Sequence, residues 1–597
     1  MTAKYPENGE SLPPSPSNLR TMASSMARPS PKILATLVVA LAVAVHVPAL
    51  FAGFFADDYL HQLALSGELP MSPWALYDFG SVADWSEMHV ERFGFPWWTS
   101  PEWKVRFFRP LASLSLALDH SVFGRNAMGY AFTGLVLYAA TLALALRLFR
   151  VLGLGPRISV GALALFSCSA STTLAVGWAA NRNSLLELFF ALLATLAAWT
   201  GARERRMGRL ALAWVCATAA AATKESGVVL FPLVAIAIVM ARPTGTGRPA
   251  WLVLAGGLFP AAAWTLGLAL GEYGTRCLFY VTPWEDPVGF LERLTMLFPL
   301  TALHLLTPLS ADLPFLAPDS TPLVVGLGVL AGIAGIVWGS KRLPDNAPFR
   351  FLLLWSVLTL APQAGAPPSD RLLLIPMVAL APLLAVILAE GLRRGGRERT
   401  LARIVVVSAG VLSMLGLFAQ RVTIGLIAGE VREAVTTADV GDRNAGPREV
   451  FVLQSGSAFV PFAMATTWHV ETDDRDVRFW PLQMGRCAVD WRRIDQRTFE
   501  VVAVDEPLLT GPFEYLYRWK TLPAKGEVYR TPLFEAEVTE ADESGVRAFR
   551  VRLDVDPDGE TIRFLAPDGD RMVALPLPDI GRTLRLERAR APRPLTP

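Results

Sequence analysis

ILATLVVALAVAVHVPALFAGFFADD, residues 33–58, is an apolar run that ends in two carboxylates. About 20 apolar residues are enough to cross a bilayer as a helix, and residues 33–54 reach that length. Asp57 and Asp58 stand where such a helix would meet the aqueous interface. The stretch therefore predicts a membrane-spanning helix with an acidic pair at one end.

Similar runs recur along the chain. They occupy 128–149, 158–180, 184–200, 209–222, 226–241, 250–271, 321–339, 350–366, 371–391 and 402–427. The whole sequence is 52% hydrophobic and only 18% charged, which is outside the usual range of soluble proteins. These features predict a mainly α fold, a polytopic transmembrane bundle of about eleven spans over 33–428. The net charge of +2 is close to neutral, so we expect no nucleic-acid partner.

The basic residues predict how the bundle is oriented. Arg20, Arg28 and Lys32 precede the first run, which places the polar tail 1–32, expected to be disordered, in the cytoplasm. With eleven spans, four Arg/Lys-rich connections also fall inside: 147–157, 201–209, 340–350 and 393–403. The segment after the last span then lies outside. The Ala- and Arg-rich composition is typical of a bacterial inner (cytoplasmic) membrane protein.

A twelfth apolar stretch, 291–309, would reverse this alternation if it crossed the bilayer. Pro299 and Pro308, together with His304, are expected to interrupt a regular lipid-facing helix. We therefore expect a re-entrant or interfacial segment. An ordinary span, with an error elsewhere in the count, remains the alternative.

The longest early connection, 55–127, lies outside by the same alternation and opens with the acidic pair. Its tryptophans are Trp74, Trp85, Trp97, Trp98 and Trp103. Indole rings prefer the headgroup level, so this loop is expected to lie along the membrane surface. An acid there could act as a general base on a lipid-linked substrate, whereas the plain alternative is a helix end in water.

Five motifs, in order, resemble those of a GT-C glycosyltransferase. They are Asp57-Asp58; Phe108-Arg109-Pro110-Leu111 with Leu118-Asp119-His120 and Phe123-Gly124; Trp178-Ala179-Ala180-Asn181-Arg182; Thr223-Lys224-Glu225-Ser226; and Ser369-Asp370-Arg371-Leu372. The pattern is most similar to the protein O-mannosyltransferase-like branch and its bacterial relatives that carry tetratricopeptide repeats. Each motif falls at an external end of a predicted span, over about 340 residues.

The chain also departs from that pattern. Residues 166–174 contain no histidine where the family has them, Ser184 replaces an aspartate, and Asp370 replaces a glutamate. No tetratricopeptide periodicity follows the last span. A divalent metal ion therefore stays open as a cofactor, with no metal ligand assigned.

The resemblance implies transfer of a sugar from a polyprenyl-phosphate donor to a protein or envelope-glycan acceptor. It implies that Asp57 accepts the acceptor proton and that Asp58 orients the acceptor or shares this role. The residues that it implies for binding the donor phosphate are Arg109, Arg182, Lys224 and Arg371. The supporting residues that it implies are Asp119, Glu225 and Asp370. Two alternatives to these roles remain. The cations could anchor the protein at the membrane interface, or Lys224–Glu225 and Asp370–Arg371 could be local ion pairs.

Residues 429–597 predict an extracytoplasmic soluble domain, β-rich or α/β. Alternating stretches at 449–453, 498–503 and 548–553 predict strands, and Asp558-Gly559 and Asp568-Gly569 predict turns. No catalytic motif stands out: His469, Asp473 and Asp474 are interpreted as part of a solvated loop. The alternative for the whole chain is a non-catalytic envelope protein that binds or transports glycolipid.

Overall fold

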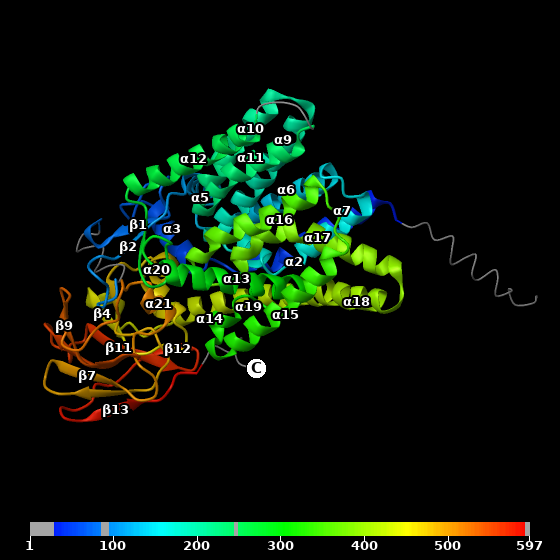
Figure 1. Ribbon diagram of the computed structural model, residues 1–597. Coiled ribbons are helices and arrows are strands. Elements are labelled where there is room, and N and C mark those ends of the chain that lie inside the picture. Colours follow the sequence, from blue (N-terminus) through cyan, green and yellow to red (C-terminus); the bar gives the residue numbers. More distant parts are fainter. Residues whose placement is uncertain (1–28, 85–94, 244–248, 591–597) are drawn as a thin grey trace, which may run out of the picture.

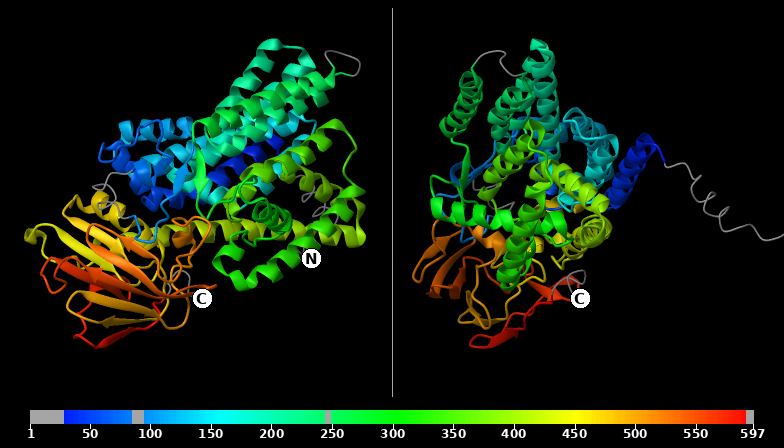
Figure 2. Two further views of the ribbon diagram at one scale, coloured as in Figure 1. Left: turned by 60° about the vertical axis from the view of Figure 1, so that its left-hand side comes forward. Right: turned by 45° about the vertical axis from the view of Figure 1, so that its right-hand side comes forward.

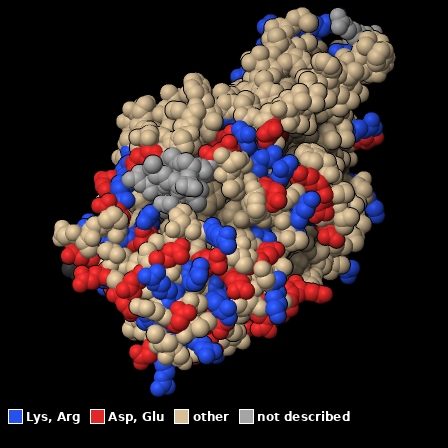
Figure 3. Space-filling model, turned by 90° about the vertical axis from the view of Figure 1, so that its left-hand side faces the viewer, with Lys and Arg blue, Asp and Glu red and all other residues tan. Residues whose placement is uncertain are grey.

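The computed structural model describes residues 29–84, 95–243 and 249–590, so Arg20, Arg28 and Trp85 fall outside it. A bundle of helices makes up most of the chain, and the C-terminal domain packs at one end of it (Figures 1 and 2). In Figure 3 charged side chains crowd the C-terminal domain, whereas the helices projecting at the top carry few. This distribution is that of a protein with one part in lipid and one part in water.

Within the described residues, eight helical segments are long and apolar enough to cross a membrane. They are Pro31–Phe51, Ala127–Val151, Ala179–Glu204, Ala250–Leu270, Pro287–Leu306, Pro318–Ser340, Asp370–Arg394 and Gly396–Thr436. In Figure 1 their main helices are α2 (Pro31–His46), α6 (Ala127–Val151), α9 (Arg182–Glu204), α12 (Ala250–Leu270), α13 (Pro287–Leu306), α15 (Thr321–Ser340), α17 (Leu374–Arg394), and α18 (Gly396–Val406) with α19 (Ser413–Thr436). Seven of the eight coincide with predicted runs, and the eighth is α13.

The other four predicted runs fold as shorter helices. These are α7 (Pro156–Ser167) with α8 (Thr172–Gly177), α10 (Met207–Ala221), α11 (Leu230–Ala241) and α16 (Ala347–Leu360). The break after α7 has a local cause, because the Ser169 hydroxyl contacts the Ser171 hydroxyl at 2.7 Å and accepts from its N–H group. Serine hydroxyls that bond to nearby groups in this way compete with helix continuation.

The predicted interruption at Pro299 is wrong, because α13 (Pro287–Leu306) continues through it and ends just before Pro308. Arg293, near the start of α13, donates to the Gly365 carbonyl, and His304, near its end, contacts Asp370. Gly365 and Asp370 both belong to the connection between α16 and α17. α13 therefore lies beside this connection along much of its length. It is also long and apolar enough to cross a membrane, so the re-entrant or interfacial placement stays a prediction.

A small sheet joins two connections at the same end of the bundle. β1 (Asp78–Ser81) pairs with β2 (Lys104–Arg106), which pairs with β3 (Gly274–Arg276) just after α12. The predicted external loop and the α12–α13 connection therefore lie together. The predicted alternation of eleven spans places these two connections on the same side.

The C-terminal domain is α/β. β4 (Arg448–Val452) lies parallel to β5 (Val477–Pro481) and to β11 (Ile562–Asp568), and α20 (Phe459–Thr472) joins β4 to β5. β12 (Arg571–Ala574) completes this sheet after a turn at Asp568-Gly569. The second sheet is antiparallel, in the order β13 (Thr583–Leu586), β6 (Val489–Arg493), β7 (Thr498–Ala503), β10 (Gly545–Leu553), β9 (Phe534–Asp542) and β8 (Val528–Arg530). The three predicted strands are β4, β7 and β10.

Two expectations about side chains in this region are wrong. Trp97, Trp98 and Trp103 are buried against the C-terminal domain instead of lying at headgroup level, and only Trp74 is exposed among the described loop tryptophans. The domain offers these rings a packed apolar environment, which excludes more water than an interface can. His469 is buried on α20 and does not belong to a solvated loop.

Candidate functional site

The acidic pair opens the short helix α3 (Asp57–Leu65), which follows a strained residue. Ala56 has φ 47° and ψ −115°, a backbone conformation that residues with a Cβ rarely adopt. The chain turns sharply there and directs Asp57 to a cavity of about 140 Å³. The walls come from α3, from the loop around β1 and β2, from Tyr280, and from the C-terminal domain.

Asp57 and Asp58 have different surroundings. Asp58 is buried, and its carboxylate accepts from the Phe55 N–H at 3.1 Å and the Ala180 N–H at 2.7 Å. Asp57 is half-buried, and within the described part of the chain its carboxylate accepts no hydrogen bond. Asp58 thus anchors the start of α3 to the segment before α9 (Arg182–Glu204), and Asp57 is left free to meet a ligand.

Burial raises the pKa of Asp57, and the charges of Arg371 and then Arg109 oppose that rise. Burial likewise raises the pKa of Asp58 to about 7, against the effect of its two backbone hydrogen bonds. A carboxylate whose pKa is raised binds a proton more readily, which suits a general base. Arg371 and Arg109 are both phosphate ligands predicted from the sequence, and their charges act on Asp57 in the structure.

Arg109 is held by a carboxylate and two rings. Its guanidinium donates to Glu225 at 2.7 and 2.9 Å and lies over Phe107 and Tyr77. Glu225 therefore pairs with Arg109, and the alternative Lys224–Glu225 ion pair does not form. Lys224 instead donates to the Ser184 hydroxyl at 3.0 Å. Ser184 thereby contacts a cation at a position where the related motif has an aspartate.

Arg182 is enclosed by the protein. Its side chain is 3% exposed and pairs with Asp119 at 2.5 Å. It also donates to the Tyr130 carbonyl at 2.6 Å and to Ser115. Because these partners occupy the guanidinium, this geometry favours a structural role for the Arg182–Asp119 pair. A direct phosphate contact by Arg182 stays a prediction.

Arg371 is the most available of the four cations. It lies over the ring of Trp178, 5.6 Å from the centroid, and the Trp178 indole N–H donates to the Phe55 carbonyl. Within the described residues its guanidinium has no hydrogen bond or carboxylate partner, so the Asp370–Arg371 ion pair does not form either. The cation is therefore held beside the start of α3 with its donors free.

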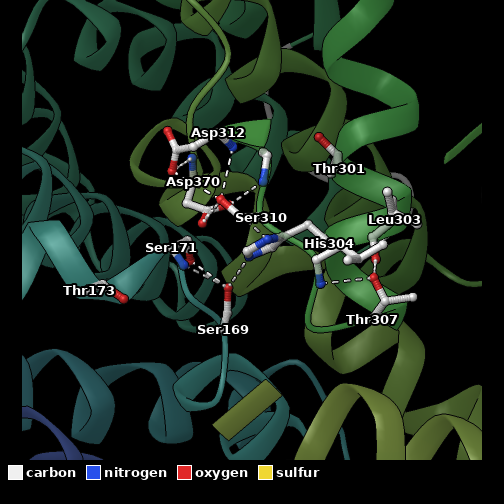
Figure 4. A network of polar contacts seen from close by, with 12 residues as sticks. Ser169, Ser171, Thr173, Thr301, Leu303, His304, Thr307, Ser310, Asp312 and Asp370 are labelled. Carbon is white, nitrogen blue, oxygen red and sulfur yellow. Dashed lines mark hydrogen bonds and ion pairs between the residues drawn. The ribbon is translucent and has the colours of Figure 1, made fainter. Parts of the chain in front are cut away.

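Asp370 is instead the centre of a buried network (Figure 4). Its carboxylate accepts from the Ser310 hydroxyl and the Ala311 N–H, both at 2.7 Å, and from Gln420 at 3.1 Å. His304 Nδ1 lies 3.1 Å from it, and His304 Nε2 lies 2.8 Å from the Ser169 hydroxyl. This network fixes the residue next to Arg371.

Other site residues were missed from the sequence. Tyr280 and Tyr517 line the cavity, yet each comes from a connection without a recognisable motif. The sequence indicates His304 only as part of the 291–309 stretch. His61, in the same loop as Tyr77, is buried against the Tyr77 ring. In the part that the structure describes, no cluster of three or more His, Cys, Asp or Glu side chains could hold a metal ion.

No protein-family model and no curated protein sequence matches the chain. Among solved structures, it is similar to an oligosaccharyltransferase of Archaeoglobus fulgidus tethered with an acceptor peptide (14% identity, TM-score 0.43). That alignment covers 75% of this chain and 63% of the archaeal one, less than two thirds of its length. ArnT from Cupriavidus metallidurans, bound to undecaprenyl phosphate, is similar at 14% identity and TM-score 0.37, over 74% of this chain and 89% of ArnT. Both similarities are distant.

Proposed function

We propose that this chain is a membrane glycosyltransferase of the GT-C type. It takes a sugar from a polyprenyl-phosphate donor and passes it to a hydroxyl of an extracytoplasmic acceptor. One observation carries the proposal: the Asp57 carboxylate, which accepts no hydrogen bond from the described residues, faces a cavity and lies near the positive charges of Arg371 and Arg109. The ordered motifs around these residues also support it.

The reaction needs a base because a hydroxyl is a poor nucleophile. The acceptor oxygen forms a bond to the anomeric carbon while its proton passes to the Asp57 carboxylate. The bond from that carbon to the phosphate oxygen breaks, and its electron pair leaves with the polyprenyl phosphate. Attack opposite the leaving group inverts the anomeric centre.

The departing phosphate needs cations at the place where its charge develops. Arg371, whose guanidinium has no hydrogen-bond partner among the described residues, is the first candidate, and Arg109 and Lys224 add positive charge nearby. Among the described residues that line the cavity, Asp57 is the one acidic residue, so these residues do not provide a ligand set for a divalent metal ion. No step is assigned to such an ion.

The alternative is a protein that binds or transports glycolipid without chemistry. Such a protein could use the same cations, but it would not need a free carboxylate with a raised pKa at the cavity. Asp57→Asn separates the two, because it keeps the shape and removes the base.

The test uses cells that lack the gene, complemented with wild type or Asp57→Asn, with mass spectrometry of envelope glycans. We expect the variant to lose about 100- to 10,000-fold in transfer rate, the usual contribution of a general base. Equal amounts of inserted protein, checked by immunoblot and size exclusion, are the control. Unchanged glycans with Asp57→Asn would reject the proposal.

Sidedness is tested separately with Asp57→Cys and a membrane-impermeant maleimide. Labelling from the extracytoplasmic side is expected, because the donor sugar is exposed there. Protection in intact cells, together with labelling after permeabilisation from the cytosolic side, would exclude Asp57 as the base.

A further inference from the structure

The C-terminal domain forms part of the cavity that Asp57 faces. Phe462, Ala463 and Thr466 line it from one face of α20, and Leu516 and Tyr517 line it from the segment after α21 (Pro512–Tyr515). This wall and the general base therefore come from parts of the chain more than 400 residues apart. The domain is thus a component of the site in addition to being a separate folded unit.

The wall is fixed in place by the external loop. The Ser100 N–H donates to the Tyr517 carbonyl at 2.9 Å, and the Trp103 indole donates to the Leu516 carbonyl at 2.8 Å. Arg518, the next residue, donates to the Trp98 carbonyl at 2.9 Å. Three consecutive residues are tied to the loop, so Tyr517 is held before any ligand arrives, which lowers the entropy cost of binding.

The lining has the chemistry of a sugar site. Seven of its fourteen residues carry aromatic rings, and the Trp103 and Tyr517 rings stack at 6.1 Å. Aromatic faces attract the slightly positive C–H groups on the apolar face of a pyranose. The polar side chains on the wall are Asp57, Tyr280, Thr466 and Tyr517, a carboxylate and three hydroxyls that suit hydroxyls around a ring.

Size and polarity disfavour other occupants. A cavity of about 140 Å³ is smaller than the roughly 300–1,000 Å³ of most ligand pockets, so it suits a single ring. A peptide segment would bring backbone N–H and C=O groups against aromatic walls, where unpaired polar groups are costly. A polyprenyl chain would leave the carboxylate and hydroxyls of the wall without partners.

We infer that the cavity beside Asp57 is the acceptor subsite, and that its occupant is a pyranose ring of a carbohydrate acceptor. This inference rests on the proposed function, which supplies the acceptor role of the occupant. It adds the chemical class of that acceptor. Tyr517 and Phe462 contact the ring, and Thr466 contacts one of its hydroxyls. Burial and the Asp57 charge raise the pKa of Tyr517, so its phenol stays protonated as a donor.

The test is binding without donor, so it does not depend on transfer. Full-length protein in nanodiscs is titrated with the methyl pyranosides of glucose, mannose, galactose and N-acetylglucosamine, and binding is followed by saturation-transfer NMR. We expect at least one glycoside to bind, with strongest saturation on its ring C–H protons. Tyr517→Ala should weaken it about tenfold, and Tyr517→Phe should weaken it less. Tyr515→Ala, two residues away and outside the lining, is the matched control and should bind normally.

Several results would overturn the inference. One is saturation transfer to a Ser/Thr-containing peptide when none of the glycosides binds. That result would identify a peptide acceptor. Binding that Tyr517→Ala and Tyr517→Phe leave unchanged would place the glycoside elsewhere, and absence of binding would remove the subsite. Failure of the proposed function would be visible independently, as unchanged envelope glycans with Asp57→Asn alongside normal glycoside binding.

Discussion

Two carboxylates at the same end of the bundle, those of Asp57 and Asp370, differ in their surroundings. Asp370 is 2% exposed and is saturated by His304, Ser310, Ala311 and Gln420. Asp57 faces a cavity and, among the described residues, accepts no hydrogen bond. A saturated carboxylate holds structure, whereas an unsatisfied one in a cavity is available to a substrate. Asp57 and Asp370 both belong to motifs that are equally recognisable in the sequence.

The largest expected effect is on stability and separates the two acids directly. Asp370→Asn should destabilise the protein by about 3–5 kcal/mol, because it leaves buried partners without their charge. Asp57→Asn should cost no stability, since no partner is lost. Thermal unfolding of both variants in the same nanodiscs provides the comparison. Equal losses of stability would show that the two carboxylates do not differ in how much they stabilise the fold.

Arg371→Gln is expected to lower kcat/KM about 10- to 100-fold, the cost of a charged hydrogen bond to phosphate. It should also move the pH profile. Asp57 must be ionised to act, so kcat/KM falls as the pH drops through its pKa. Arg371 lowers that pKa, so its removal raises the pKa further and moves the acid limb to higher pH.

The acid limb itself is therefore expected above the usual range for an aspartate, because burial raises the Asp57 pKa. Lys341→Gln is the matched control, because Lys341 directly follows the last residue of α15 and is not part of the candidate site. It should leave both kcat/KM and the acid limb of the pH profile unchanged. An unchanged acid limb in Arg371→Gln would show that the Arg371 charge does not affect the pKa of Asp57.

His304 offers a smaller and more specific test. Asn can replace Nδ1 and keep the contact with Asp370, whereas Gln can replace Nε2 and keep only the hydrogen bond to Ser169. If the network positions Arg371 through Asp370, His304→Asn should retain most activity and His304→Gln should lose about tenfold. The acid limb should move in His304→Gln alone. The reverse order of the two variants would assign His304 to anchoring the Ser169 turn.

The smallest effect is expected at Ala56. Ala56→Gly should relieve a positive φ and stabilise the protein by up to about 1 kcal/mol, measured as a rise in Tm. The start of α3 would then be less fixed, and a fall in kcat of a few fold is expected. A loss of stability would show that the surrounding contacts, and not the sequence of the turn, set this conformation.

Much of the site was predictable from local sequence. Asp57 and Arg371 lie where their motifs meet the ends of apolar runs, whereas Arg109 lies just before α5 (Pro110–Phe123). The structure brings the three charges near one another. Arg182 and Glu225 come from equally recognisable motifs, but their partners, Asp119 and Arg109, are 63 and 116 residues away. No local pattern shows which arginine is already paired.

Composition and periodicity alone determined that the chain is a helical membrane protein with an α/β or β-rich C-terminal domain. Those features act over one turn or one strand, where hydrophobic burial and backbone hydrogen bonding are decided. Only the tertiary structure decided which carboxylate is free, and that Tyr517 reaches the same cavity as Asp57. Such facts depend on distances between segments hundreds of residues apart, which are fixed by packing.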